Sequence, residues 1–148
     1  MKLYHFTSPL HVKGCTKEGI NKGSIPLYKD GRYGLLPGWQ WLTSNPDFNQ
    51  QWANTEFSTL PYDRTAHRLT IVIPKAARNR LHKWLDICKK LPIDKHLNAY
   101  GDPDNWYVFQ GMVKPGWIRR VEQKEKETAE YKKAAKGTVY HAPGGRAR

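Results

Sequence analysis

Several short stretches of the chain alternate bulky apolar side chains with polar ones, which predicts β-strands. The clearest is residues 67–73, where Leu69, Ile71 and Ile73 share one face. Alternation then places Arg68 on the opposite, polar face of the same strand. Three other stretches have a similar pattern and are also predicted to be strands: residues 2–7, 39–44 and 106–113.

Other segments carry the spacing or the composition of helices. A short helix is expected over residues 9–18, because Ser8 is a suitable N-cap and Gly19 a suitable end. Residues 119–136 are rich in Glu, Lys and Ala, which predicts a largely solvated basic helix. A third helix is predicted over residues 76–90 from apolar side chains at helical spacing: Leu81, Trp84, Leu85 and Cys88.

Glycine and proline mark the remaining connections. Five of them fall within residues 26–38, which predicts a long loop of the kind that often carries function. Residues 91–105 are predicted to be a second loop, and residues 48–60 are ambiguous. Residues 138–148 contain few apolar anchors and are predicted to be a mobile tail.

This mixture of strands and helices has no regular βαβ order, so the predicted fold class is α+β with a small sheet. We expect one domain over residues 1–120, followed by a charged helix and basic tail over residues 121–148. Aromatic residues make up 12% of the chain and include six Trp, so most of it is expected to fold.

The net charge of the chain indicates a class of binding partner. The 148-residue chain has a formal net charge of +12, which suits a polyanionic partner such as a nucleic acid or an acidic protein. The alternative is an ordinary solvated basic surface. Cys15 and Cys88 lie far apart and no Cys/His spacing typical of metal ligands occurs, so no metal site is expected. Without a long apolar run, the chain is expected to be cytoplasmic and reduced, with no membrane contact.

Two of the predicted strands carry side chains suited to a ligand site. Alternation places His5 and Thr7 on one face of residues 2–7, and Trp41 and Thr43 on one face of residues 39–44. An imidazole, an indole and two hydroxyls fit a ligand with a flat ring and sugar hydroxyls. The alternative is that His5 is a half-buried structural histidine and that the tryptophans belong to the core.

The order of these motifs resembles the ADP-ribosyltransferase-like domains, in particular the tRNA 2′-phosphotransferase and DNA-targeting branches. The opening segment Leu3–Ser8, followed by a helix and the step Glu18–Ile20, is similar to the start of these domains. Trp41–Ser44 resembles their second aromatic and hydroxyl-bearing strand. Tyr107–Ile118 looks like their closing strand and the step that follows it.

The resemblance covers roughly residues 2–118 and implies a small split-sheet α+β fold with a cleft for NAD. It implies that His5 binds the ribose on the adenosine side, with Thr7 beside it. It also implies that Trp41 stacks near the nicotinamide, with Thr43 close by.

One departure concerns catalysis. These domains usually carry a glutamate on the closing strand, where this chain has Trp106, and the nearest polar candidate is Gln110. A glutamine amide is not a general base. Phosphotransferase-type members lack that glutamate and use His and Arg, which makes Arg68 a candidate phosphate ligand. Arg68 has the alternative of a surface ion pair with Asp63.

Two hypotheses follow from different classes. The first is an NAD-dependent ADP-ribosyltransferase with His5, Arg68 and Gln110 as candidate catalytic residues. The second is a non-catalytic basic module that binds nucleic acid or an acidic protein, such as a phage or mobile-element accessory protein. The sequence leaves the acceptor and the oligomeric state open. The first hypothesis predicts that His5, Thr7, Trp41 and Thr43 line one pocket.

Overall fold

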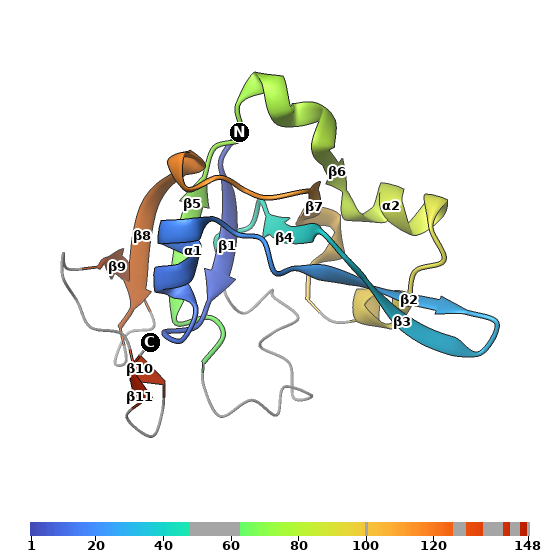
Figure 1. Ribbon diagram of the computed structural model, residues 1–148, viewed down its shortest axis with the longest axis horizontal. Helices are drawn as coiled ribbons and strands as arrows, with labels where there is room; N and C mark the ends of the chain where they lie inside the picture. Colours follow the sequence, from blue (N-terminus) through green and yellow to red (C-terminus); the bar gives the residue numbers. More distant parts are fainter. Residues whose placement is uncertain (48–62, 100, 126–129, 135–140, 143–145, 148) are drawn as a thin grey trace.

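A computed structural model describes residues 1–47, 63–99, 101–125, 130–134, 141–142 and 146–147. In this part of the chain a seven-stranded antiparallel sheet has the order β6-β7-β4-β1-β5-β8-β9, with few helices (Figure 1). The predicted α+β class is therefore confirmed. The ambiguous segment 48–60 and most of the predicted tail lie outside the described residues.

The strands and helices fall into the following segments. The sheet contains β1 (Leu3–Thr7), β4 (Trp39–Thr43), β5 (His67–Ile71), β6 (Leu81–Lys83), β7 (Trp106–Gln110), β8 (Ile118–Lys124) and β9 (Tyr131–Lys133). Two hairpins lie outside it: β2 (Ser24–Lys29) with β3 (Arg32–Pro37), and β10 (His141–Ala142) with β11 (Arg146–Ala147). The helices are α1 (Val12–Glu18), α2 (Trp84–Lys90) and the 3₁₀ turns Lys75–Arg80, Lys95–Ala99, Pro103–Asn105 and Pro115–Trp117.

The sheet is divided between its two central strands. β1 pairs with β5 from Leu3–Ile71 through Thr7–His67. β1 pairs with β4 only at Tyr4–Thr43, after which the two strands diverge. The sheet therefore consists of two well-paired parts, β6-β7-β4 and β1-β5-β8-β9, which meet at one position.

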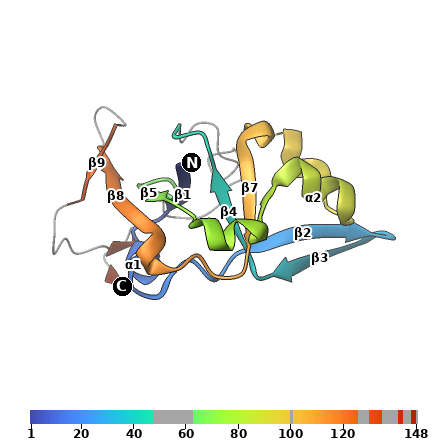
Figure 2. The same cartoon turned by 90° about the horizontal axis from the view of Figure 1, so that it is seen from above.

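Two apolar cores cover opposite faces of the sheet. The first contains Val12 of α1, and the second contains residues of α2 and Ile25 at the base of the β2–β3 hairpin. Figure 2 shows the two helices at different ends of the sheet. Neighbouring residues of β7 belong to different cores, since Val108 packs in the second and Phe109 in the first. This alternation fixes which side chains of β1, β4 and β5 face α1.

The predicted loop over residues 26–38 was wrong, because this segment is mostly the β2–β3 hairpin. Asp30 and Gly31 both have positive φ, 53° and 78°, and form a two-residue turn between Lys29 and Arg32. Asp-Gly is a favoured sequence for such a turn because its residues tolerate the left-handed conformation.

The single helix predicted over residues 76–90 was also wrong. The segment forms a 3₁₀ turn, the edge strand β6 and then α2. Leu81 packs against the first core, whereas Trp84 lies in the second. The chain crosses the edge of the sheet between these two residues, so their helical spacing does not reflect one apolar helix face.

The basic helix predicted over residues 119–136 was wrong, because the described part of this segment contains the strands β8 and β9. β8 pairs along β5, from Ile71–Ile118 to His67–Gln123, and crosses the expected domain boundary at residue 120. Glu122 is buried and faces Arg68 of β5. Pairing with a central strand outweighs the helix propensity of Glu and Lys, which is worth only tenths of a kcal/mol per residue.

Acidification is expected to destabilise the fold through His67. This side chain on β5 is 1% exposed, and burial lowers the pKa of its ring from 6.5 to about 4, although Asp63 opposes the shift. The unfolded chain therefore binds more protons than the native one between pH 6.5 and 4. The free energy of unfolding should fall by about 3 kcal/mol as the pH is lowered through this range.

Urea denaturation at pH 7 and at pH 4.5 measures this effect. His67→Gln, which does not titrate, should show a smaller loss of stability between the two pH values than the wild type. The pKa of His5 is also lowered by burial, so part of the pH dependence should remain. An unchanged pH dependence in His67→Gln would exclude His67 as its source.

Candidate functional site

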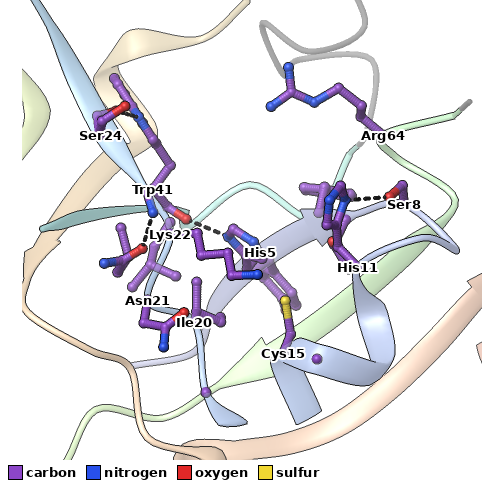
Figure 3. A pocket seen from close by; sticks show the side chains of 18 of the residues that line it. His5, Ser8, His11, Cys15, Ile20, Asn21, Lys22, Ser24, Trp41 and Arg64 are labelled. Atoms are coloured by element: carbon purple, nitrogen blue, oxygen red, sulfur yellow. Dashed lines mark hydrogen bonds between the residues drawn. The ribbon is translucent and has the colours of Figure 1, made fainter. Parts of the chain in front are cut away.

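A pocket of about 980 Å³ lies where β1 and β4 diverge. Residues from both strands line it, together with α1, the segment 19–24 that follows α1, and Arg64. Figure 3 shows Trp41 and Lys22 on one side of His5, and His11 and Arg64 on the other. All four residues expected to share a pocket line this one: His5, Thr7, Trp41 and Thr43.

His5 links the two parts of the sheet. Its Nδ1 lies 2.7 Å from the carbonyl oxygen of Trp41, across the gap between β1 and β4. A carbonyl only accepts, so Nδ1 carries the proton and donates. Burial lowers the pKa of His5, the hydrogen bond to Trp41 opposes this, and the charge of Arg64 adds to it. The ring is therefore neutral at pH 7, and its Nε2 is a hydrogen-bond acceptor.

Trp41 forms a fixed wall of the pocket. Its indole N–H donates to the carbonyl oxygen of Ser24 at 2.9 Å. The ring also packs against Trp84 and Trp106, with centroid distances of 4.5 and 5.9 Å. Trp41 therefore packs against the second core and also lines the pocket, and these contacts fix its position without a ligand.

The two threonines differ. The Thr43 hydroxyl donates to the Asn105 carbonyl oxygen at 3.2 Å and accepts from the Asn45 N–H at 3.1 Å, so it serves the fold. Thr7 is 6% exposed and is hydrogen-bonded to the thiol of Cys15. Burial raises the pKa of that thiol, which keeps Cys15 protonated and weakly nucleophilic near neutral pH.

Sequence reasoning missed the charged and polar rim of the pocket. Ser8 Oγ and His11 Nδ1 are 2.9 Å apart and form a hydrogen-bonded pair at the start of α1. The remaining charged side chains belong to α1, to the segment after it, and to the segments before β5 and after α2, where no alternation pattern singles them out. The cationic ones are Lys13, Lys17, Lys22 and Arg64, and the acidic ones are Glu18 and Asp94.

Arg68 and Gln110 are not among the lining residues. Arg68 pairs in register with Phe6, so it lies on the face opposite His5 and Leu69. It binds Glu122 and the carbonyl oxygen of Pro46 rather than Asp63. Gln110 is exposed at the end of β7, next to Trp39. Trp106 does line the pocket, but it is 2% exposed and belongs to the second core.

Comparisons with protein-family models, with curated proteins and with solved structures found no match. Within the described residues, no helix is long and apolar enough to cross a membrane. The same part of the chain contains no group of three or more His, Cys, Asp or Glu side chains placed to hold a metal ion.

Proposed function

We propose that this pocket binds NAD or an ADP-ribose-type ligand, and that the protein is an ADP-ribosyltransferase-like enzyme acting on a nucleic acid or protein acceptor. The observation that carries the proposal is the position of the pocket. It opens at the division of the sheet, between the two strands whose sequences resemble that family. His5, Thr7 and Trp41 line it together.

The size and charge of the pocket support a dinucleotide. Its volume of about 980 Å³ is at the upper end of the range for small-molecule and cofactor sites. Lys13, Lys17, Lys22 and Arg64 outnumber the two carboxylates at its rim. A pyrophosphate carries two negative charges at neutral pH, and such cations bind it well.

The individual side chains suit parts of such a ligand. The neutral His5 ring offers Nε2 as an acceptor for a ribose hydroxyl, while its Nδ1–H remains on the Trp41 carbonyl. The fixed indole of Trp41 offers an apolar surface to a nicotinamide or adenine ring. Lys22 and Arg64 approach from opposite sides and suit the phosphates (Figure 3).

The second candidate function is binding without turnover. It is favoured by the placement of Arg68 and Gln110, because neither candidate catalytic residue lines the pocket. The carboxylates that do line it are Glu18, at the end of α1, and Asp94, and neither lies on the closing strand β7, where the resemblance implies a glutamate. Binding of NAD and turnover of NAD are therefore separate questions with separate tests.

His5→Ala is expected to weaken the binding of NAD and of ADP-ribose roughly tenfold, because it removes one hydrogen bond to a ribose hydroxyl. Titration calorimetry on the wild type and the variant measures this change. Adenosine should bind more weakly than ADP-ribose to the wild type, since it lacks the phosphates.

His96→Ala is the matched control. His96 is exposed in the turn Lys95–Ala99 and does not line the pocket. The affinity of the His96→Ala variant for NAD should therefore equal that of the wild type. The absence of any heat with NAD and ADP-ribose at millimolar concentration would exclude the proposed ligand class. Equal losses in His5→Ala and His96→Ala would exclude this pocket.

A further inference from the structure

The β2–β3 hairpin projects away from the sheet beyond α2 (Figure 1). It is a regular ribbon, paired from Ser24–Pro37 to Lys29–Arg32. Because side chains alternate across a strand, each face of the ribbon has its own set of residues. The two faces have different surroundings.

One face packs on the body of the protein. Ile25 is 0% exposed in the second core, and Leu27 and Leu36 pack against the same cluster. Leu27 also forms a bridge with Ile93, so this face is anchored.

The opposite face is exposed and apolar. Tyr28 and Tyr33 are opposite each other, with ring centroids 4.6 Å apart. They are 44% and 76% exposed, and Leu35 is 71% exposed. The described part of the chain has five exposed large apolar side chains, and these three share one face of one hairpin. Clustered exposure of this kind marks an interaction surface, whereas scattered single residues do not.

This exposed face leads into the pocket. Pro26 is opposite Leu35, one step along the same face from the tyrosine pair, and both residues line the pocket. Ser24, the next residue of this face, also lines the pocket and binds the indole of Trp41. We define the stacking track as the surface formed by Tyr28, Tyr33, Pro26 and Leu35.

The charges next to the stacking track are mostly positive. Lys29 and Arg32 flank the turn at the tip of the hairpin, one position beyond the tyrosine pair, and alternation places them on the other face. Lys22 lies at the base of the hairpin and lines the pocket. Asp30 is the only acidic residue between positions 22 and 37. Exposed aromatic rings with cations beside them are the arrangement that binds single-stranded nucleic acid, by stacking of bases and by contact with phosphates.

We propose that the stacking track binds single-stranded nucleic acid, with bases stacked on Tyr28 and Tyr33 and with the phosphate backbone passing around the tip of the hairpin, where Lys29 and Arg32 bind it. The bound nucleic acid then runs along Pro26 and Leu35 toward the pocket. If the pocket holds NAD, this nucleic acid is the acceptor. Only this last step rests on the proposed function. Binding of the strand does not depend on it.

Fluorescence anisotropy with labelled 12-nucleotide DNA and RNA single strands, and with a duplex of the same DNA sequence, tests this proposal. Tyr33→Ala should weaken single-strand binding roughly 5- to 100-fold, because one base loses its stacking partner. Tyr33→Phe should bind like the wild type. Tyr33→Leu keeps an apolar side chain without the flat ring and should behave like Tyr33→Ala.

Met112→Ala is the control for exposed apolar side chains, since Met112 is 38% exposed but lies outside the hairpin. It should bind the oligonucleotides like the wild type. The double substitution Lys29→Ala/Arg32→Ala should reduce the slope of log affinity against log salt by about 1.4 in magnitude, corresponding to two phosphate contacts.

Several results would overturn the proposal. One is that the wild type binds no oligonucleotide, or that it binds the duplex as tightly as the single strand. Another is that Tyr33→Ala or Tyr33→Leu binds the single strand with the affinity of the wild type. NAD titration of Tyr33→Ala should be unchanged, and oligonucleotide binding by His5→Ala should be unchanged. Failure of the stacking track and failure of the NAD pocket are thereby distinguished.

Discussion

Arg68→Ala is expected to lower the free energy of unfolding by about 3–5 kcal/mol while the folded protein keeps its affinity for NAD. Arg68 Nε and Nη2 donate to one oxygen of Glu122, at 3.2 and 2.9 Å. Glu122 is 6% exposed, so the variant leaves its carboxylate buried without this partner. Breaking a buried ion pair from one side has a cost of this size.

Other contacts hold Arg68 in place and add to the loss. Its Nη1 donates to the carbonyl oxygen of Pro46 at 3.0 Å. The guanidinium also lies over the rings of Tyr131 and Tyr4, at 4.4 and 5.5 Å from their centroids. Arg68 therefore joins β1, β5, β8 and β9 on the sheet face away from the pocket.

Urea denaturation compares the wild type with Arg68→Ala and with Arg120→Ala. Arg120 lies 3.5 Å from the other oxygen of Glu122, but its side chain is 56% exposed, so its loss should cost less than about 1 kcal/mol. Arg68→Met/Glu122→Leu, which removes both charges, should recover most of the stability. A stable Arg68→Ala protein that no longer binds NAD would contradict this role and restore Arg68 as a phosphate ligand.

The role of Arg68 marks a limit of the sequence argument. Alternation correctly placed it on the polar face of its strand, opposite Leu69 and Ile71. The identity of its partner depends on the register between β5 and β8, and residues 119–136 were predicted to be helical. Without β8 as a strand, Glu122 was not a candidate partner for Arg68, and the candidates were a ligand phosphate and Asp63.

The strands with a clear apolar face were the predictable part of the fold. β1, β4, β5 and β7 were placed within a few residues, because in each of them bulky apolar residues mark the face that packs in a core. β6 and β8 were missed because their pairing is a tertiary effect. β2 and β3 were missed because Pro26, Gly34 and Pro37 are typical of loops, although a two-stranded ribbon accommodates them.

The pocket was predictable only on its strand side. His5, Thr7 and Trp41 were expected together and line one cavity. Thr43 lines it too, but its hydroxyl is bound to the chain around Asn105. Lys22, Arg64 and the Ser8–His11 pair come from segments without periodicity. Their convergence depends on the path of the chain after β1 and before β5.

The isolated protein is expected to hydrolyse NAD at a rate close to that of the uncatalysed reaction, and Gln110→Glu is expected to leave this rate unchanged. A positioned general base commonly contributes about 10²–10⁴-fold. Trp106 stands where the resemblance implies a glutamate, and this side chain is 2% exposed and has no basic group. A carboxylate introduced at Gln110 would be exposed at the end of β7, outside the pocket lining, and would not reach a bound ribose.

Release of nicotinamide from labelled NAD, followed over hours with the wild type, His5→Ala and Gln110→Glu, measures this rate. Adding the 12-nucleotide single strands should raise turnover in the wild type if they are the acceptor, and His5→Ala should reduce that gain. Brisk hydrolysis by the wild type alone would contradict the expectation. In that case Glu18→Gln and Asp94→Asn identify which of the two carboxylates lining the pocket acts as the base. A rate increase in Gln110→Glu of tenfold or more would instead place residue 110 beside the bound ribose.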